Sequence, residues 1–126
     1  MVQIQPRKEI AFNGVTAGTG LVSRAFGVDN AGRLSLMVYG VGVTAGSATF
    51  YVEVSNDDTL GFVPYNRLIS NVTNSNAQND TKVSLIQQTT TGTSIVFFPD
   101  SDTFNFVRVR ADVWPTGTYS AVFYIN

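Results

Sequence analysis

The most closely spaced carboxylates in this sequence are the pair Asp57 and Asp58 and the pair Asp100 and Asp102. Carboxylates in loops can bind Ca²⁺, and two carboxylic acids at a set separation in a cleft can hydrolyse a glycosidic bond. Aspartate is also favoured in tight turns, because its side chain bonds to the nearby backbone. Both pairs fall where the chain needs a turn, so we interpret them as turn residues.

The chain contains no histidine and no cysteine. The usual residues for acid–base catalysis near neutral pH, for thiol chemistry and for zinc binding are therefore missing. We expect no metal, no cofactor and no enzymatic activity, and we expect a function in binding or assembly.

Few of the 126 residues are charged. Eight basic and nine acidic residues give a formal net charge of −1, and the charged share is 13%, about half the usual value. A nucleic-acid-binding protein carries a basic patch, and a membrane-surface protein carries a basic tract, so we expect neither kind of partner. A surface of Thr, Ser, Asn and Gln repels other proteins weakly and favours close packing against them.

No stretch reaches the roughly 18 consecutive apolar residues of a transmembrane helix. No apolar run of signal-peptide length follows the basic residues near the N-terminus. We therefore expect a soluble protein that is made in the cytoplasm.

Apolar and polar residues alternate in at least six segments between residues 10 and 126. Such patterns, separated by turns rich in Gly, Asn and Asp, are typical of antiparallel β-sandwiches. We predict an all-β fold: a polar N-terminal arm over residues 1–9 and one antiparallel sandwich over residues 10–126, jelly-roll or Ig-like, with about eight or nine strands. The side chains expected to point inward are Ile10, Phe12, Leu34, Leu36, Val38, Phe50, Val52, Val54, Val107, Val109 and Ala111. Met37 and Tyr39 make the strand over residues 33–41 apolar on both faces, which predicts a central position.

Two segments are candidates for contact with partner proteins. The arm carries Val2 and Ile4 in strand-like alternation, and such an arm can add to the sheet edge of a neighbour. The loop over residues 71–80 is long and polar, and it contains Asn74 and Asn76.

A third candidate contact is formed by Arg108 and Arg110, which alternate with the core residues of one strand and so share its outer face. They either bind an acidic surface of a partner or pair with Glu53 or Asp112 on the same sheet, as cross-strand neighbours often do.

Aromatic residues indicate an alternative function as a carbohydrate-binding module. Rings that stack on a ligand must be exposed on one face, whereas sandwich cores also contain many aromatics. Trp114 precedes a proline at a strand end, so we expect it to plug one end of the sandwich. The other rings considered for a sugar platform are Tyr39, Tyr51, Phe62, Tyr65, Tyr119 and Tyr124.

Two parts of the chain resemble a recurring pattern in structural proteins of bacteriophages. The first is the run ATFYVEVSNDD over residues 48–58, followed by FVP at 62–64. It is similar to a strand that ends in Ser-x-Asp-Gly and leads through an aromatic residue to a return strand. The second is FVRVRA at 106–111 with TGTYSA at 116–121, which is similar to the closing hairpin of the same proteins. Asp58 stands where glycine is usual, and Phe62 stands where tryptophan is usual.

This resemblance implies a β-sandwich protein of the phage virion. The resemblance does not say which component of the virion, and we expect first a capsid decoration or head-fibre-like subunit, with a tail or neck component as the alternative. Its partners would be further copies of itself, as a homo-oligomer, and other virion proteins, among them the major capsid protein.

We predict that deleting residues 1–8 leaves the sandwich folded but weakens oligomerisation or binding to the particle, because the arm's main-chain hydrogen bonds supply affinity. Circular dichroism checks the fold and sedimentation checks assembly. Equal assembly of the truncated and full chains would place the contact elsewhere, and the loop over residues 71–80 would be the next segment to test.

Overall fold

The computed structural model describes residues 6–18, 20–28, 33–44, 46, 48–69, 82–83, 85–99, 103–112 and 114–126. These residues form twelve β-strands and no helix, which confirms the predicted all-β fold. The strands are β1 (Arg7–Gly18), β2 (Leu21–Val22), β3 (Phe26–Gly27), β4 (Leu34–Val41), β5 (Ala48–Ser55), β6 (Val63–Pro64), β7 (Leu68–Ile69), β8 (Lys82–Val83), β9 (Leu85–Gln88), β10 (Gly92–Phe97), β11 (Phe106–Ala111) and β12 (Trp114–Ile125).

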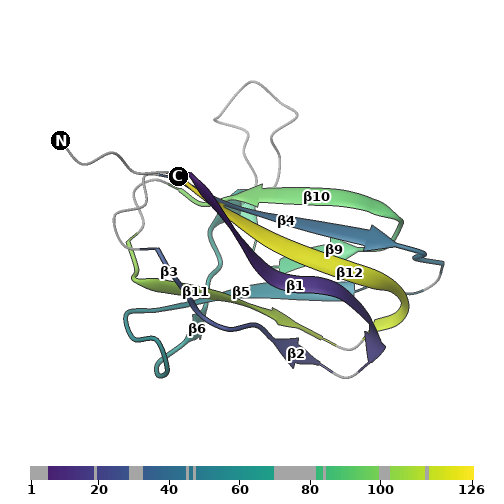
Figure 1. Cartoon of the computed structure of the whole chain (residues 1–126), viewed down its shortest axis with the longest axis horizontal. Helices are drawn as coiled ribbons and strands as arrows, with labels where there is room; N and C mark the ends of the chain where they lie inside the picture. Colours follow the sequence, from purple (N-terminus) through teal and green to yellow (C-terminus); the bar gives the residue numbers. More distant parts are fainter. Residues whose placement is uncertain are drawn as a thin grey trace.

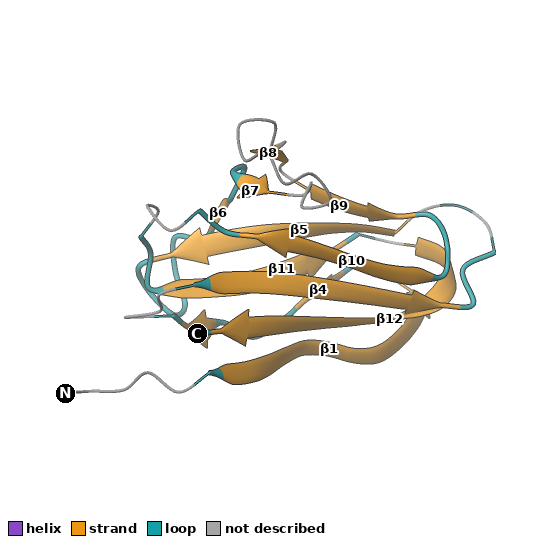
Figure 2. Cartoon of the chain, turned by 90° about the horizontal axis from the view of Figure 1, so that it is seen from above, coloured by secondary structure: helices purple, strands orange, loops and turns teal. Residues whose placement is uncertain are grey.

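The strands form two antiparallel sheets that pack face to face, as an antiparallel sandwich requires (Figure 1). Sheet A has the order β1-β12-β4-β10-β7-β8, and Figure 2 looks onto it with β1, β12, β4 and β10 side by side. Sheet B has the order β2-β11-β5-β6, and in addition β3 pairs with β11 and β9 pairs with β5. The strand count exceeds eight or nine because the edges of both sheets are broken into short segments, β7 and β8 in sheet A and β2, β3, β6 and β9 in sheet B.

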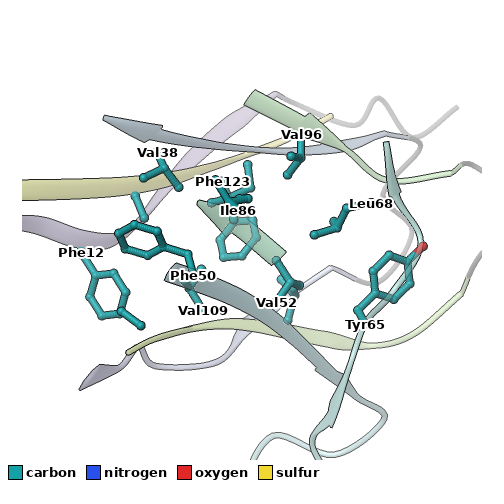
Figure 3. Packing of buried hydrophobic residues seen from close by; sticks show 14 of the residues in the cluster. Phe12, Val38, Phe50, Val52, Tyr65, Leu68, Ile86, Val96, Val109 and Phe123 are labelled. Carbon is teal, nitrogen blue, oxygen red and sulfur yellow. The ribbon is translucent and has the colours of Figure 1, made fainter. Parts of the chain in front are cut away.

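The core lies between the two sheets, where apolar side chains from both inner faces meet (Figure 3). Val38 and Phe123 of sheet A and Phe50, Val52 and Val109 of sheet B have no exposed surface at all. Burying each such side chain contributes about 1.5–3 kcal/mol. The predicted alternation in β4, in most of β5 and in β11 is therefore confirmed, with Val54 half-buried against the core.

β1 departs from the simple alternation, because Phe12 is buried while Ile10 is 54% exposed. Ile10 pairs with Val122, but Phe12 pairs with Ala121, so β1 advances by two residues where β12 advances by one. Such a bulge turns the following side chain to the other face. The prediction that Ile10 and Phe12 share one face was wrong for this reason.

One end of the core is filled by a cluster of aromatic rings. The ring of Tyr119 lies 5.4 Å from those of Phe50 and Trp114, centroid to centroid, and Trp114 is 1% exposed. Gly40 lies opposite Tyr119 in the sheet, and a Cβ there would be 2.6 Å from the ring. The expectation that Trp114 is buried near a strand end is confirmed.

The edge of sheet A is tied to the edge of sheet B by the first residues of β1. The Arg7 guanidinium donates a hydrogen bond to the carbonyl of Gly27, and Arg24 Nη2 lies 2.9 Å from a carboxylate oxygen of Glu9. Residues 7–9, assigned from the sequence to the arm, thus pair with β12. A deletion that tests the arm alone should therefore stop before Arg7, while Val2 and Ile4 lie outside the described residues.

We predict that Val109→Asp prevents soluble folding, because an unpaired charge in the core costs several kcal/mol or more. Arg108→Ala is the matched control: its side chain leaves the same strand on the opposite face, and a partly exposed ion pair contributes about 1 kcal/mol. Soluble yield and urea unfolding measure both. Equal stability of the two variants would contradict the facing of β11.

Candidate interaction surfaces

Arg108 and Arg110 lie on the outer face of sheet B, where both contact Glu53 of β5. Arg108 Nε is 2.8 Å from one carboxylate oxygen of Glu53, and Arg110 Nε is 3.4 Å from the other. Arg110 Nη1 is also 3.0 Å from a carboxylate oxygen of Asp112. The pairs with Glu53 and Asp112 considered from the sequence are therefore present, and the pairs with Glu53 cross from β11 to β5.

Two rings complete this charge cluster. The Arg108 guanidinium carbon lies 4.1 Å from the centroid of the Phe62 ring, and that of Arg110 lies 4.4 Å from the centroid of Tyr51. Planar guanidinium groups often stack on aromatic faces in this way. Glu53 lies on the outer face of its strand yet is only 8% exposed, because the two arginines contact it there.

The charge cluster is formally neutral, since two arginines face two carboxylates. A partner that binds here would meet paired charges instead of a free basic patch, and it would have to compete with pairs that already exist. A contact between these arginines and another protein stays a prediction.

The outer face of sheet A differs from that of sheet B, because most of the side chains on it are apolar. The strand register places Ile10, Val122, Met37 and Ile95 in one row across β1, β12, β4 and β10. The neighbouring rows on β12, β4 and β10 are Tyr124, Ser35 and Phe97 on one side, and Ser120, Tyr39 and Thr93 on the other. We call these ten residues the apolar face.

Six residues of the apolar face are large hydrophobics with 36% or more of their surface exposed: Ile10, Met37, Tyr39, Ile95, Phe97 and Tyr124. The largest apolar patch on a soluble protein is often a functional contact site. From the sequence we predicted that Met37 and Tyr39 belong to a central strand. β4 does lie between β12 and β10, but nothing described covers its second face. β10 likewise carries apolar residues on this face, Ile95 and Phe97, while Val96 points to the core.

Asp57 caps the turn between β5 and β6. Its Oδ1 accepts hydrogen bonds from the Thr59 backbone N–H at 2.8 Å, the Thr59 hydroxyl at 2.9 Å and the Leu60 N–H at 3.0 Å. These bonds hold the pKa of Asp57 below its usual value, and the bond from the Thr59 backbone has the largest effect. The interpretation of Asp57 as a turn residue is therefore confirmed, and Asp100 and Asp102 lie outside the described residues.

The described surface is also hollowed beside the turn between β5 and β6. A hollow of about 510 Å³ beside the β5–β6 turn is lined by Val54, Ser55, Asn56, Gly61, Val63, Tyr65, Thr103 and Phe104. Within the described ranges, no three acidic residues gather as metal ligands would, and no helix there could span a membrane. Asn74 and Asn76 fall outside these ranges.

The aromatic residues considered as a sugar platform are divided between core and surface. Trp114, Tyr119 and Tyr65 are buried, and Tyr51 and Phe62 are covered by arginines. Tyr39 and Tyr124 are exposed on the same face, but Tyr39 pairs with Ser120, four residues along β12 from Tyr124. That offset is about 14 Å along the strand.

No family model and no curated protein matches this sequence. Among solved structures, the fold is similar to that of the SPBc2 prophage-derived protein YomS, known from a crystal structure. The two share a TM-score of 0.63 over 99% of this chain and 97% of that chain, at 15% sequence identity. The similarity shows a common fold over nearly the full length of both proteins, and a common fold alone does not define a function.

We predict that Asp57→Asn destabilises the protein at pH 7 but not at low pH. A carboxyl whose pKa is lowered by folding stabilises the protein above its unfolded pKa, near 4, and this contribution is lost as the pH falls through the folded pKa. Urea unfolding of both proteins between pH 2 and pH 7 would show the difference shrinking with acid. Asp58→Asn, which leaves the three hydrogen bonds in place, is the control. A difference that stays constant with pH would contradict the role of the Asp57 charge.

Proposed function

We propose that this chain is a non-enzymatic structural protein of a bacteriophage virion, a capsid decoration or head-fibre-like subunit. The observation that carries the proposal is the fold shared over nearly its whole length with a prophage-derived protein. The sequence supports it independently, because both segments that resemble phage structural proteins form adjacent strands: residues 48–58 contain β5, which pairs with β11 from the second segment.

Assembly on a particle suits the two outer faces of the sandwich. The apolar face offers area that other proteins can cover, and the neutral charge cluster on sheet B creates little repulsion between neighbouring subunits. On a symmetric lattice, weak contacts of single copies add to a high overall avidity. The proposed partners are further copies of the chain and other virion proteins, among them the major capsid protein.

A tail or neck component is the alternative position within the virion, since the fold suits both. A carbohydrate-binding module is the alternative from another class. It would rely on Tyr39 and Tyr124, the exposed rings of the apolar face.

We predict that the chain migrates with phage heads when particles of a genome that encodes it are separated on a density gradient. Mass spectrometry of the head and tail fractions measures where it lies and in how many copies. Heads from a genome lacking the gene should bind the purified chain when it is added back.

Recovery with tails alone would place the protein in the tail or neck. Its absence from every particle fraction, combined with specific binding on a glycan array, would replace the virion proposal by the carbohydrate-binding module.

A further inference from the structure

We propose that the apolar face binds the same face of a second copy of this chain, so that two sandwiches pack sheet to sheet about a twofold axis. The inference rests on the proposed function, which leads us to expect that copies assemble. It adds the surface through which two copies meet.

The size of the apolar face fits a dimer contact. Four strands about 4.8 Å apart and the eight residues of β4 at about 3.4 Å each outline roughly 19 Å by 27 Å, or about 500 Å² in plan. Projecting side chains have more accessible surface than this plan area. A stable interface buries about 800 Å² on each partner, so the plan of the four strands supplies about two-thirds of that area, and the projecting side chains add to it.

The charge distribution favours a second copy as the occupant. β12, β4 and β10 contain no charged residue, and the charges of β1 are confined to its first three residues. Arg7 and Glu9 contact the edge of sheet B, which leaves Lys8 at one corner of the face. A surface without charge meets no repulsion from its own copy and has nothing to attract a strongly charged partner.

The residue sizes are complementary under twofold symmetry. On each of three strands, a large residue on one side of the Met37 row is matched by a small one on the other side: Tyr124 by Ser120, Tyr39 by Ser35, and Phe97 by Thr93. A twofold axis along that row places each large side chain over the small residue of the other copy. Alternating large and small residues are what lets two layers interdigitate, and an isologous contact is the commonest in homodimers.

The geometry of this contact resembles the packing inside the sandwich. Strands of the two copies would run nearly aligned, about 30° apart because of sheet twist, at a layer spacing of about 10 Å. Met37 lies in the central row, so Met37 of one copy faces Met37 of the other. This self-contact makes the proposal testable with one position.

We predict that the wild-type chain forms a dimer in sedimentation equilibrium and that Met37→Glu raises the dimer Kd about 100-fold or more, because two carboxylates then face each other. Met37→Lys should act in the same way. An equimolar mixture of the two variants should restore a dimer, seen by native mass spectrometry as the mixed species. Val22→Glu is the matched control, since Val22 is 52% exposed on sheet B, and it should leave the dimer Kd unchanged.

Three outcomes of these experiments would overturn the inference. A wild-type chain that stays monomeric at about 100 µM overturns the inference, since an interface of standard size, about 1,600 Å² in total, binds in the micromolar range or tighter. A dimer that Met37→Glu does not weaken, or one that the mixture fails to restore, also overturns it. Circular dichroism and melting temperature confirm that each variant is folded.

Particle binding, measured in parallel, separates this inference from the proposed function. A dimer that is absent from phage particles supports the inference and contradicts the virion role. A monomer that binds particles only when Met37 is intact overturns the self-contact, assigns the face to another virion protein and leaves the proposed function in place.

Discussion

The packing of the Tyr119 ring over Gly40 fixes the register of β12 against β4, and both faces of sheet A depend on that register. The two strands alternate between core pairs such as Leu36 with Phe123 and outer pairs such as Met37 with Val122. A slip of one residue would exchange the two sets. Because both sets are apolar, hydrophobicity alone discriminates weakly between the registers. Only a glycine leaves room for the ring, since a Cβ at position 40 would lie 2.6 Å from it.

Most of the core could be predicted from the sequence, because strict alternation in β4 and β11 assigns each side chain to a face. The exceptions have local physical causes. Ile10 turns outward at a bulge, which depends on the pairing with β12 and has no mark in the local pattern. Glu53 follows the alternation, yet it is buried by Arg108 and Arg110 from the neighbouring strand. The apolar face was visible as a second apolar stripe in β4, but its exposure is a property of the assembled sheets.

The two outer faces of the sandwich therefore differ in chemistry. Sheet B neutralises its own charges: Glu53 lies between two arginines, and each arginine also contacts an aromatic ring. Replacing such pairs by contacts with another protein costs desolvation and broken bonds. Sheet A presents apolar area whose burial is favourable without any rearrangement. Association should thus be strongest through sheet A, and the charge cluster should mainly keep the opposite face soluble.

The edges of the sheets point to the same face. An unpaired edge strand can recruit another chain, and natural proteins prevent this with bulges, prolines and short strands. β1 shows three register shifts against β12, with Gly14 at a φ of 62°, and β6 is two residues long and ends in Pro64. The described edges are therefore poor templates for strand addition. An N-terminal arm that adds to a neighbour's sheet would have to use such an edge, whereas face-to-face packing needs none. Of the two routes to self-association, the apolar face requires the smaller change in the folded chain.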